Sequence, residues 1–191
     1  MKAKISMLVS FIVVLTASAQ GTVNFANTAT SLLIEGLGGP PVPVGQFTVE
    51  LLYWASDPGA TTWSSSIAGL TSIKTSANFV SPGRFIGGVA TTPATTAGGA
   101  TAWFAVVAWQ TSFGSYDAAV TGGGFYGYTG AFQNATGNPN AVPPGPAAAL
   151  NVFTGNNNIL LVPEPSILWL SAVGAAGMLS FRGRKTTINK G

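Results

Sequence analysis

Apolar and polar positions alternate with a period of two along much of the chain, and no window keeps a helical period of 3.6 residues for long. In the segment GQFTVELLYWA, Phe47, Val49, Leu51 and Tyr53 lie on one face of an extended chain, and the residues between them lie on the other. The segment TAWFAVVAWQT, residues 101–111, is instead a continuous apolar run rich in β-branched and aromatic residues. The first pattern predicts a half-buried strand and the second a central strand.

Other short segments have the composition of strands, and turn-forming residues separate them. The separators SDPGA, SPGR, GGG, GNPN, PPGP and TGNNN are rich in Gly, Pro, Asn or Asp. Many short strands divided by such turns favour two packed sheets, and nothing indicates alternating strands and helices. We therefore predict an all-β fold, an antiparallel β-sandwich or jelly roll of about eight strands. The other predicted strands cover residues 22–26, 31–35, 61–65, 78–80, 84–90, 150–154 and 158–162.

Two segments of the same region favour irregular structure. Residues 90–101, ATTPATTAGGAT, are of low complexity, and residues 137–148 contain enough proline to predict a loop across the surface. We find no internal repeat at a fixed period.

The N-terminal segment has the three parts of a secretory signal peptide. Lys2 and Lys4 form a positive region, residues 7–15 form an apolar region, and Ala17 and Ala19 provide the small residues that signal peptidase requires. The alternative is a first transmembrane helix, but the apolar run is short for a span and ends in a cleavage site. Residues 1–19 are therefore predicted to be a signal peptide.

A second apolar run covers residues 167–181 and is followed by Arg182, Arg184 and Lys185. As a helix it would rise about 22 Å, less than the roughly 30 Å of the hydrocarbon core, so spanning needs help from its flanking residues. The alternative is a buried core helix, but the basic residues that follow favour a membrane end held in the cytoplasm. We predict a single transmembrane helix with residues 182–191 as a basic cytoplasmic tail.

Val162, Pro163, Glu164 and Pro165 precede this run, and the prolines keep the backbone extended and accessible. This motif, followed by a short apolar helix and a basic cluster, resembles the PEP-CTERM sorting signal of exopolysaccharide-producing Gram-negative bacteria. The resemblance covers residues 163–191 and divides the chain into a signal peptide, a passenger domain of residues 20–162 and this sorting signal.

The resemblance implies that an exosortase, an integral membrane processing enzyme, recognises the Pro-Glu-Pro element and processes the chain close to it. It implies that residues 167–181 stop in the inner membrane and that Arg182, Arg184 and Lys185 form the cytoplasmic stop. Signal peptidase and exosortase are then the processing partners, exopolysaccharide is a candidate partner, and the mature protein belongs to the cell envelope or the extracellular space.

The chain has five acidic and eight basic residues, and neither cysteine nor histidine. The passenger holds only Lys74 and Arg84 against four acidic residues, which argues against a nucleic-acid partner. The missing residue types exclude disulfides, thiolate metal sites and histidine-dependent catalytic triads. We expect no cofactor and no metal.

The acidic residues of the passenger are Glu35, Glu50, Asp57 and Asp117, and two carboxylates are enough for glycoside hydrolysis. Asp57 begins the turn SDPG, Asp117 follows GSY in a similar setting, and Glu50 is predicted to face solvent on its strand. Asp57, Asp117 and residues 156–158 also offer oxygen ligands for calcium, but no spaced ligand loop is present. Ordinary turn residues are the favoured interpretation.

The segment GGGFYGYTGAFQN places Phe125, Tyr126, Tyr128 and Phe132 among glycines. Flat aromatic rings beside amides and hydroxyls are what a sugar-binding surface needs, so these four residues are the candidate sugar-stacking set. The favoured alternative is a Gly-rich turn with packed aromatic residues, and core packing explains Trp103 and Trp109.

The working hypothesis is an exported, non-catalytic surface or extracellular-matrix protein that a C-terminal signal sorts. A carbohydrate-binding module for exopolysaccharide is the alternative from a different class. A carboxylate-based glycoside hydrolase is the third hypothesis, and it is the least favoured.

Overall fold

The computed structural model describes residues 20–59, 67–154 and 157–163 as a mostly β structure, with eleven strands, one α-helix and two short 3₁₀ helices. The predicted signal peptide, the predicted strand at residues 61–65 and the predicted transmembrane helix lie outside these residues. The elements are β1 Thr22–Ala26, β2 Leu33–Glu35, β3 Phe47–Trp54, β4 Thr71–Ser76, β5 Phe79–Ser81, β6 Arg84–Thr91, β7 Thr101–Gln110, η1 Thr111–Phe113, α1 Tyr116–Gly122, β8 Phe125–Tyr128, β9 Phe132–Ala135, β10 Ala148–Ala149, η2 Asn151–Phe153 and β11 Ile159–Pro163.

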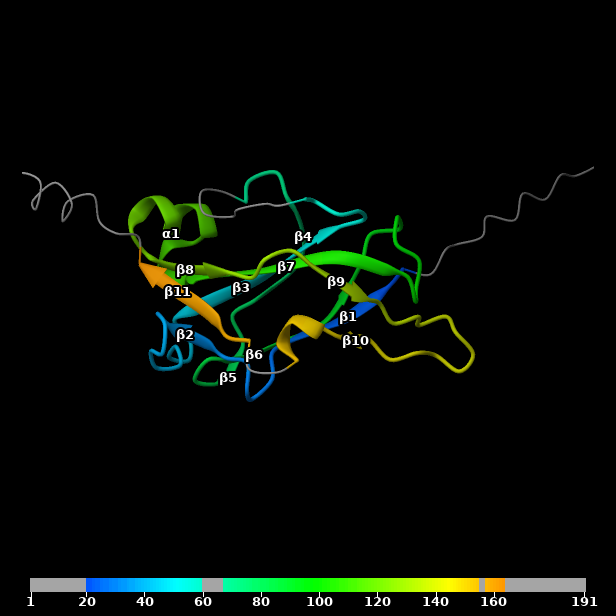
Figure 1. Ribbon diagram of the computed structural model, residues 1–191, viewed down its shortest axis with the longest axis horizontal. Helices are drawn as coiled ribbons and strands as arrows, with labels where there is room; N and C mark the ends of the chain where they lie inside the picture. Colours follow the sequence, from blue (N-terminus) through cyan, green and yellow to red (C-terminus); the bar gives the residue numbers. More distant parts are fainter. Residues whose placement is uncertain (1–19, 60–66, 155–156, 164–191) are drawn as a thin grey trace, which may run out of the picture.

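The strands form two sheets (Figure 1). The larger sheet has the order β2-β11-β8-β7-β3-β4 with β9 also paired to β7, and the smaller has the order β10-β1-β6-β5. Most neighbours are antiparallel, as predicted, but β1 pairs with β10 and β2 with β11 in parallel. Parallel neighbours need a long connection, so no local turn in the sequence could have indicated them.

Strand β7 is the longest and organises the larger sheet. It pairs with β3 from Phe47 opposite Gln110 to Trp54 opposite Trp103, and its other edge is shared by β8 and β9. Thr129 lies in the chain between β8 and β9. Its backbone N–H donates to the Val106 carbonyl at 2.8 Å, and its Oγ1 accepts from the Val106 N–H at 2.8 Å. Thr129 therefore continues the backbone pairing of β7 where β8 ends.

One hydrophobic core lies between the two sheets. Alternate residues of β1, β5 and β6 on one side meet alternate residues of β3, β7 and β11 on the other. Phe85 is fully buried there, and its ring centroid lies 4.9 Å from that of Phe25 and 5.8 Å from that of Phe153. This shared core is what the alternation of apolar positions in the sequence predicts.

A second cluster covers the opposite face of the larger sheet, where α1 packs (Figure 1). Leu52, on the even face of β3, is 1% exposed and belongs to this cluster, and Glu50 on the same face is only partly exposed. The prediction that β3 is half-buried is therefore wrong, whereas Glu50 does keep part of its surface exposed. Strand β3 is central like β7, because a helix and a loop cover the face that would otherwise meet water.

Helix α1 was not predicted from the sequence. Ser115 caps its N-terminus by accepting a hydrogen bond from the Ala118 N–H at 3.1 Å, and Gly123 ends it in the left-handed conformation with φ 73°. Its seven residues span about two turns, too few to establish a 3.6-residue period. Asp117 lies in the first helical turn rather than in the turn that the sequence favoured.

The other strand predictions largely agree with the structure. The segments 22–26, 84–90, 101–111 and 158–162 correspond to β1, β6, β7 and β11, and shorter strands lie within or beside 31–35 and 78–80. The predicted strand at 150–154 is wrong, because η2 forms there and the Phe153 N–H bonds the Leu150 carbonyl at 3.2 Å. The sequence missed β4, β8, β9 and β10. These strands are short, polar or glycine-containing and lack a clear alternating apolar face.

The two segments predicted to be irregular do lack long elements, but side chains anchor the first of them. Thr92 and Thr96 are buried, and Thr92 Oγ1 donates to the carbonyl of Gly21 at 3.1 Å. Tyr53 on β3 hydrogen-bonds through its hydroxyl to Thr95 Oγ1 at 2.9 Å. A low-complexity sequence is therefore compatible with a fixed loop when its hydroxyl groups find buried partners.

Asn27 connects three backbone segments beneath the smaller sheet. Its Nδ2 donates to the carbonyls of Ser31 at 2.7 Å and Gly83 at 2.8 Å, and its Oδ1 accepts from the Phe85 N–H at 2.8 Å. Because the side chain is 4% exposed, water cannot replace these partners easily.

In Asn27→Asp a carboxylate oxygen, which can only accept, replaces the amide Nδ2 that donates to two carbonyl oxygens. We expect Asn27→Asp to lower the free energy of unfolding by at least about 2 kcal/mol in urea denaturation at neutral pH. The exposed Asn140→Asp is the matched control and should change it by less than about 0.5 kcal/mol. Equal effects of the two variants would contradict the structural role of Asn27.

Tyr116 on α1 forms the centre of the outer cluster, with ring centroids 6.5 Å from Trp109 and 5.6 Å from Tyr126. Burial raises the pKa of the Tyr116 phenol well above its ordinary value, and the neighbouring Tyr126, Tyr128 and Asp117 add to the increase. Below about pH 10 the phenol is protonated in both states, whereas above it only the unfolded chain releases the proton.

The free energy of unfolding should therefore fall above about pH 10, with Tyr116 contributing up to about 1.4 kcal/mol per pH unit. In Tyr116→Phe this contribution is absent, so the alkaline part of the stability profile should be less steep. Urea denaturation between pH 8 and about pH 11 measures the two slopes. Parallel profiles for wild type and variant would contradict the burial of a neutral phenol.

Candidate functional site

The predicted sorting motif begins inside the last strand of the folded domain. In β11, Leu161 pairs with Glu35 of β2 in parallel, while Val162 lies opposite Tyr126 and Pro163 opposite Phe125 of β8. The Gly36 N–H also donates to the Leu161 carbonyl at 2.8 Å. Strand β11 is thus an interior strand of the larger sheet, and it extends one residue past the predicted boundary of the passenger at 162.

Side chains along β11 alternate between the core and the surface. Ile159 is 2% exposed and Leu161 is fully buried, whereas Leu160 is 38% and Val162 44% exposed. Pro163 has no backbone N–H, so its nitrogen cannot donate to a neighbouring strand where β11 ends. The motif residue Val162 is therefore held by the sheet, and no linker separates the core from the Pro-Glu-Pro element.

Gly127 on β8 permits the close approach of β11. A Cβ atom at this position would lie 2.3 Å from the carbonyl oxygen of Leu160 and 2.8 Å from the Cδ2 of Leu161. Only glycine fits there without moving the backbone of β11. This role of Gly127 was not predicted, although a glycine between Tyr126 and Tyr128 in a short strand is a signal of close backbone approach.

The remaining predicted sorting and processing residues lie outside the described residues: Ala17, Ala19, Glu164, Pro165, Arg182, Arg184 and Lys185. Within residues 20–59, 67–154 and 157–163, no helix is long and apolar enough to cross a membrane.

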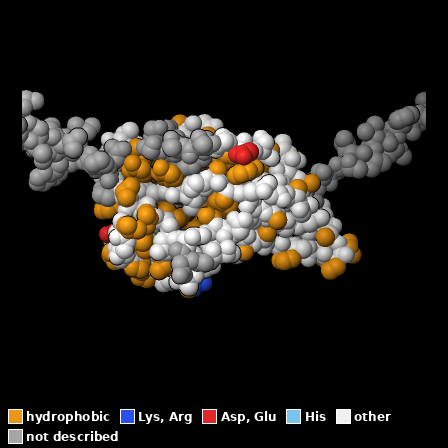
Figure 2. Space-filling view, in the orientation of Figure 1, with side chains coloured by type: hydrophobic (Ala, Val, Ile, Leu, Met, Phe, Trp, Pro, Cys, Tyr) orange, Lys and Arg blue, Asp and Glu red, His pale blue; other side chains and the backbone are white. Residues whose placement is uncertain are grey.

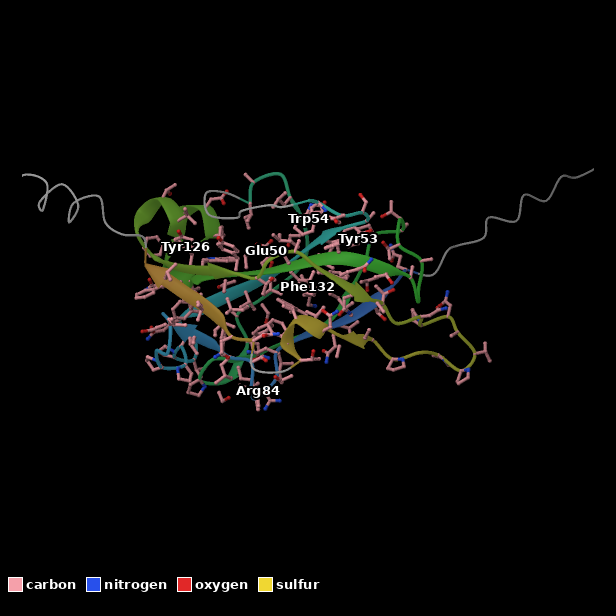
Figure 3. The ribbon with its side chains drawn as sticks, viewed as in Figure 1. Glu50, Tyr53, Trp54, Arg84, Tyr126 and Phe132 are labelled. Atoms are coloured by element: carbon pink, nitrogen blue, oxygen red, sulfur yellow. The ribbon has the colours of Figure 1, made fainter. Side chains whose placement is uncertain are left out.

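The four candidate sugar-stacking residues do not form one surface. They belong to two strands rather than a loop, and Tyr126 is only 7% exposed while it packs against Tyr116. Phe132 packs against Phe104 on the opposite side of the sheet, at a ring-centroid distance of 6.2 Å (Figure 3). Phe125 is half-buried against the same core, and Tyr128, 36% exposed, is the most accessible ring of the four.

Asp57, Asp117 and the Asn158 amide accept hydrogen bonds from backbone groups of the fold. Asp57 Oδ1 accepts from the Gly59 N–H at 2.8 Å, as its turn motif predicts, and Asp117 Oδ1 accepts from the Ile67 N–H at 2.7 Å. Asn158 Oδ1 accepts from the Leu32 N–H at 2.8 Å, next to the start of β11. In the described part of the chain, no three acidic side chains gather where they could hold a metal ion.

Asn134 opens the sequence Asn-Ala-Thr but lies inside the fold, 4% exposed. Its Nδ2 donates to the carbonyls of Ala135 and Ala149 at 2.7 and 3.1 Å, and its Oδ1 accepts from the Asn151 N–H at 2.7 Å. This amide connects β9 to the segment before β11, so its role in the folded domain is structural.

The docking of β11 can be tested at Gly127. Gly127→Val places two branches against the Leu160 carbonyl, so we expect the free energy of unfolding to fall by about 1–3 kcal/mol. Limited proteolysis should then cut near β11 faster than in the wild type. Gly130→Ala is the matched control, since a Cβ at Gly130 meets no atom within 4 Å. Equal protease sensitivity of both variants would show that β11 does not depend on this contact.

Comparison with known proteins identifies one feature of the chain. The family model described as "PEP-CTERM protein-sorting motif" matches residues 161–185, which begin at the buried Leu161 of β11. No curated protein and no solved structure matches the chain. The resemblance found in the sequence is thereby confirmed. The chain carries a PEP-CTERM sorting motif and is an exported protein that this C-terminal signal sorts.

Proposed function

We propose that the protein is a non-catalytic component of the cell surface or the extracellular matrix, delivered there as a folded β domain. The sorting motif implies export, transient anchoring in the membrane and processing by an exosortase. The observation that carries the proposal is the continuity between fold and signal: Leu161 belongs to the core, and Val162 and Pro163 belong to both the sheet and the motif.

This continuity supports a position of the domain close to the membrane in the anchored precursor. At most about 3.6 Å of chain per residue separates Pro163 from the start of the proposed membrane helix at Ile167, a total of about 14 Å. The folded domain would therefore stand directly on the membrane surface, with its last strand leading into the bilayer. Cleavage just after the motif would leave β11 complete, so the released domain keeps its core.

The character of the passenger supports a structural role. We infer that the two sheets around one core form a β-sandwich, an architecture that stays folded after its anchor is removed. Asp57 accepts a hydrogen bond within its turn, and Asp117 connects α1 to the Ile67 N–H. The rings of Phe125, Tyr126 and Phe132 pack within the fold. Local structure therefore accounts for these candidate side chains, which supports a non-catalytic function.

Replacing Pro163, Glu164 and Pro165 together with Ala should block recognition by the processing enzyme. We expect the uncleaved precursor to accumulate in the inner membrane and the exported form to fall at least about tenfold, measured by membrane fractionation and immunoblotting. Pro144→Ala, in an exposed loop of the passenger, is the control and should be processed like the wild type. Normal processing of the triple variant would refute the sorting role of the motif.

A carbohydrate-binding module is the second candidate function. The predicted aromatic set does not favour it, because its members lie on opposite faces of the larger sheet. A pocket beside Arg84 on the smaller sheet favours a carbohydrate-binding function instead.

A further inference from the structure

A pocket of about 350 Å³ lies over the outer face of the smaller sheet, where β1 pairs with β6, and η2 bounds it. Arg84 and Ile86 of β6 enter it together with Asn24 and Ala26 of β1, while the residues between them, such as Phe85, point into the core. Leu150 and Phe153 close one side. The pocket thus combines a cation, amide and hydroxyl groups, and an apolar wall.

Arg84 is unusual within this charge-poor domain. It is one of only two basic residues between positions 20 and 162, the other being Lys74. Its Nε is buried, yet in the described part of the chain this atom has no hydrogen-bond partner. Burying a charged donor without an acceptor is unfavourable. The Arg84 side chain also lines the pocket, and a guanidinium carries five N–H donors in all.

The acidic side chains of the domain are placed elsewhere. Figure 3 shows Arg84 below the smaller sheet, and Glu50 above it on the larger one. Glu35 belongs to β2 of the larger sheet, and Asp57 and Asp117 accept hydrogen bonds from the Gly59 and Ile67 N–H groups. In Figure 2 the acidic groups visible on this face are separated from the basic group, which lies at its lower edge. The acceptor that suits Arg84 would therefore come from a ligand.

The neighbours of Arg84 restrict what that ligand can be. Asn24 is exposed at the pocket, and its amide can both donate to and accept from hydroxyl groups. Ile86, 39% exposed, offers an apolar surface to C–H groups. A guanidinium can hold a carboxylate through two parallel hydrogen bonds. The volume is at the lower end for ligand pockets, which suits one small ring rather than a long segment of polymer.

We propose that this pocket binds an acidic sugar unit, with the carboxylate on Arg84, ring hydroxyls on Asn24 and the apolar face of the ring on Ile86. A uronic acid, free or exposed on a polysaccharide, has all three groups. The inference goes beyond the proposed sorting and matrix role, because the pocket lies on the smaller sheet and β11 belongs to the larger one. A failed binding test would leave the sorting proposal intact, and failed sorting would leave this one intact.

The experiment uses the full chain in detergent micelles and titrates it with four probes: glucuronate, glucose, glucose 6-sulfate and acetate. Isothermal titration calorimetry measures affinity, and NMR follows the Nε–H signal of Arg84, assigned by its absence in Arg84→Lys. We expect glucuronate to bind at least about tenfold more tightly than glucose or acetate and to shift this signal. Glucose 6-sulfate distinguishes a sulfate ester from a carboxylate and should bind more weakly.

Variants separate a local site from general charge. Arg84→Gln should weaken glucuronate binding at least about tenfold, and Arg84→Lys should weaken it less, because the charge remains while the paired donors are lost. Lys74→Gln removes the other basic residue of the domain and should bind like the wild type. Circular dichroism checks folding, and if Arg84→Gln does not fold, Arg84→Lys and the Nε–H signal of the wild type decide the test.

Several outcomes would overturn the proposal. Glucuronate that neither binds nor shifts the Arg84 signal would remove the site, and equal binding of acetate would reduce it to an anion site without a sugar. Tighter binding of glucose 6-sulfate would assign a sulfate ester in place of the carboxylate. Equal losses in the Arg84 and Lys74 variants would show that general charge, not this pocket, causes binding.

Discussion

The pairing of β3 with β7 is the interaction on which the rest of the domain depends. Eight consecutive residues of β3 lie opposite β7, and both strands are buried on both faces. One face contributes Val49, Leu51 and Val106 to the core between the sheets, and the other contributes Leu52 and Val107 to the cluster under α1. Both hydrophobic clusters therefore share this one strand pair, and losing it would expose both at once.

The sorting signal is connected to that pair by a short series of strands. Strand β8 pairs with β7, β11 pairs with β8, and Gly127 lets β8 and β11 approach closely. The motif therefore leaves the domain at a position that only the completed larger sheet defines. The chain beyond Pro163 therefore starts at the end of an ordered interior strand.

Amide and hydroxyl side chains supply the polar contacts in a domain that has few charges. Asn27 and Asn134 each bond three backbone groups, and Thr92, Thr96 and Thr129 satisfy loops and strand ends. These groups are neutral, so burying them costs less than burying ions. Against this background the buried Nε of Arg84 stands out, because it has no hydrogen-bond partner among the residues that the structure describes.

The sequence alone determined the β class, the positions of the long strands and the sorting motif, because these depend on local alternation, turn residues and a contiguous pattern. It could not determine that β3 is covered on both faces, because the seven residues of α1 show no clear period. Nor could it determine the parallel neighbours of β1 and β2, which lie more than 100 residues away in the chain. Tertiary packing alone buried Tyr126 against Tyr116 and placed Arg84 in a pocket with Asn24, because contacts between distant elements leave no local pattern.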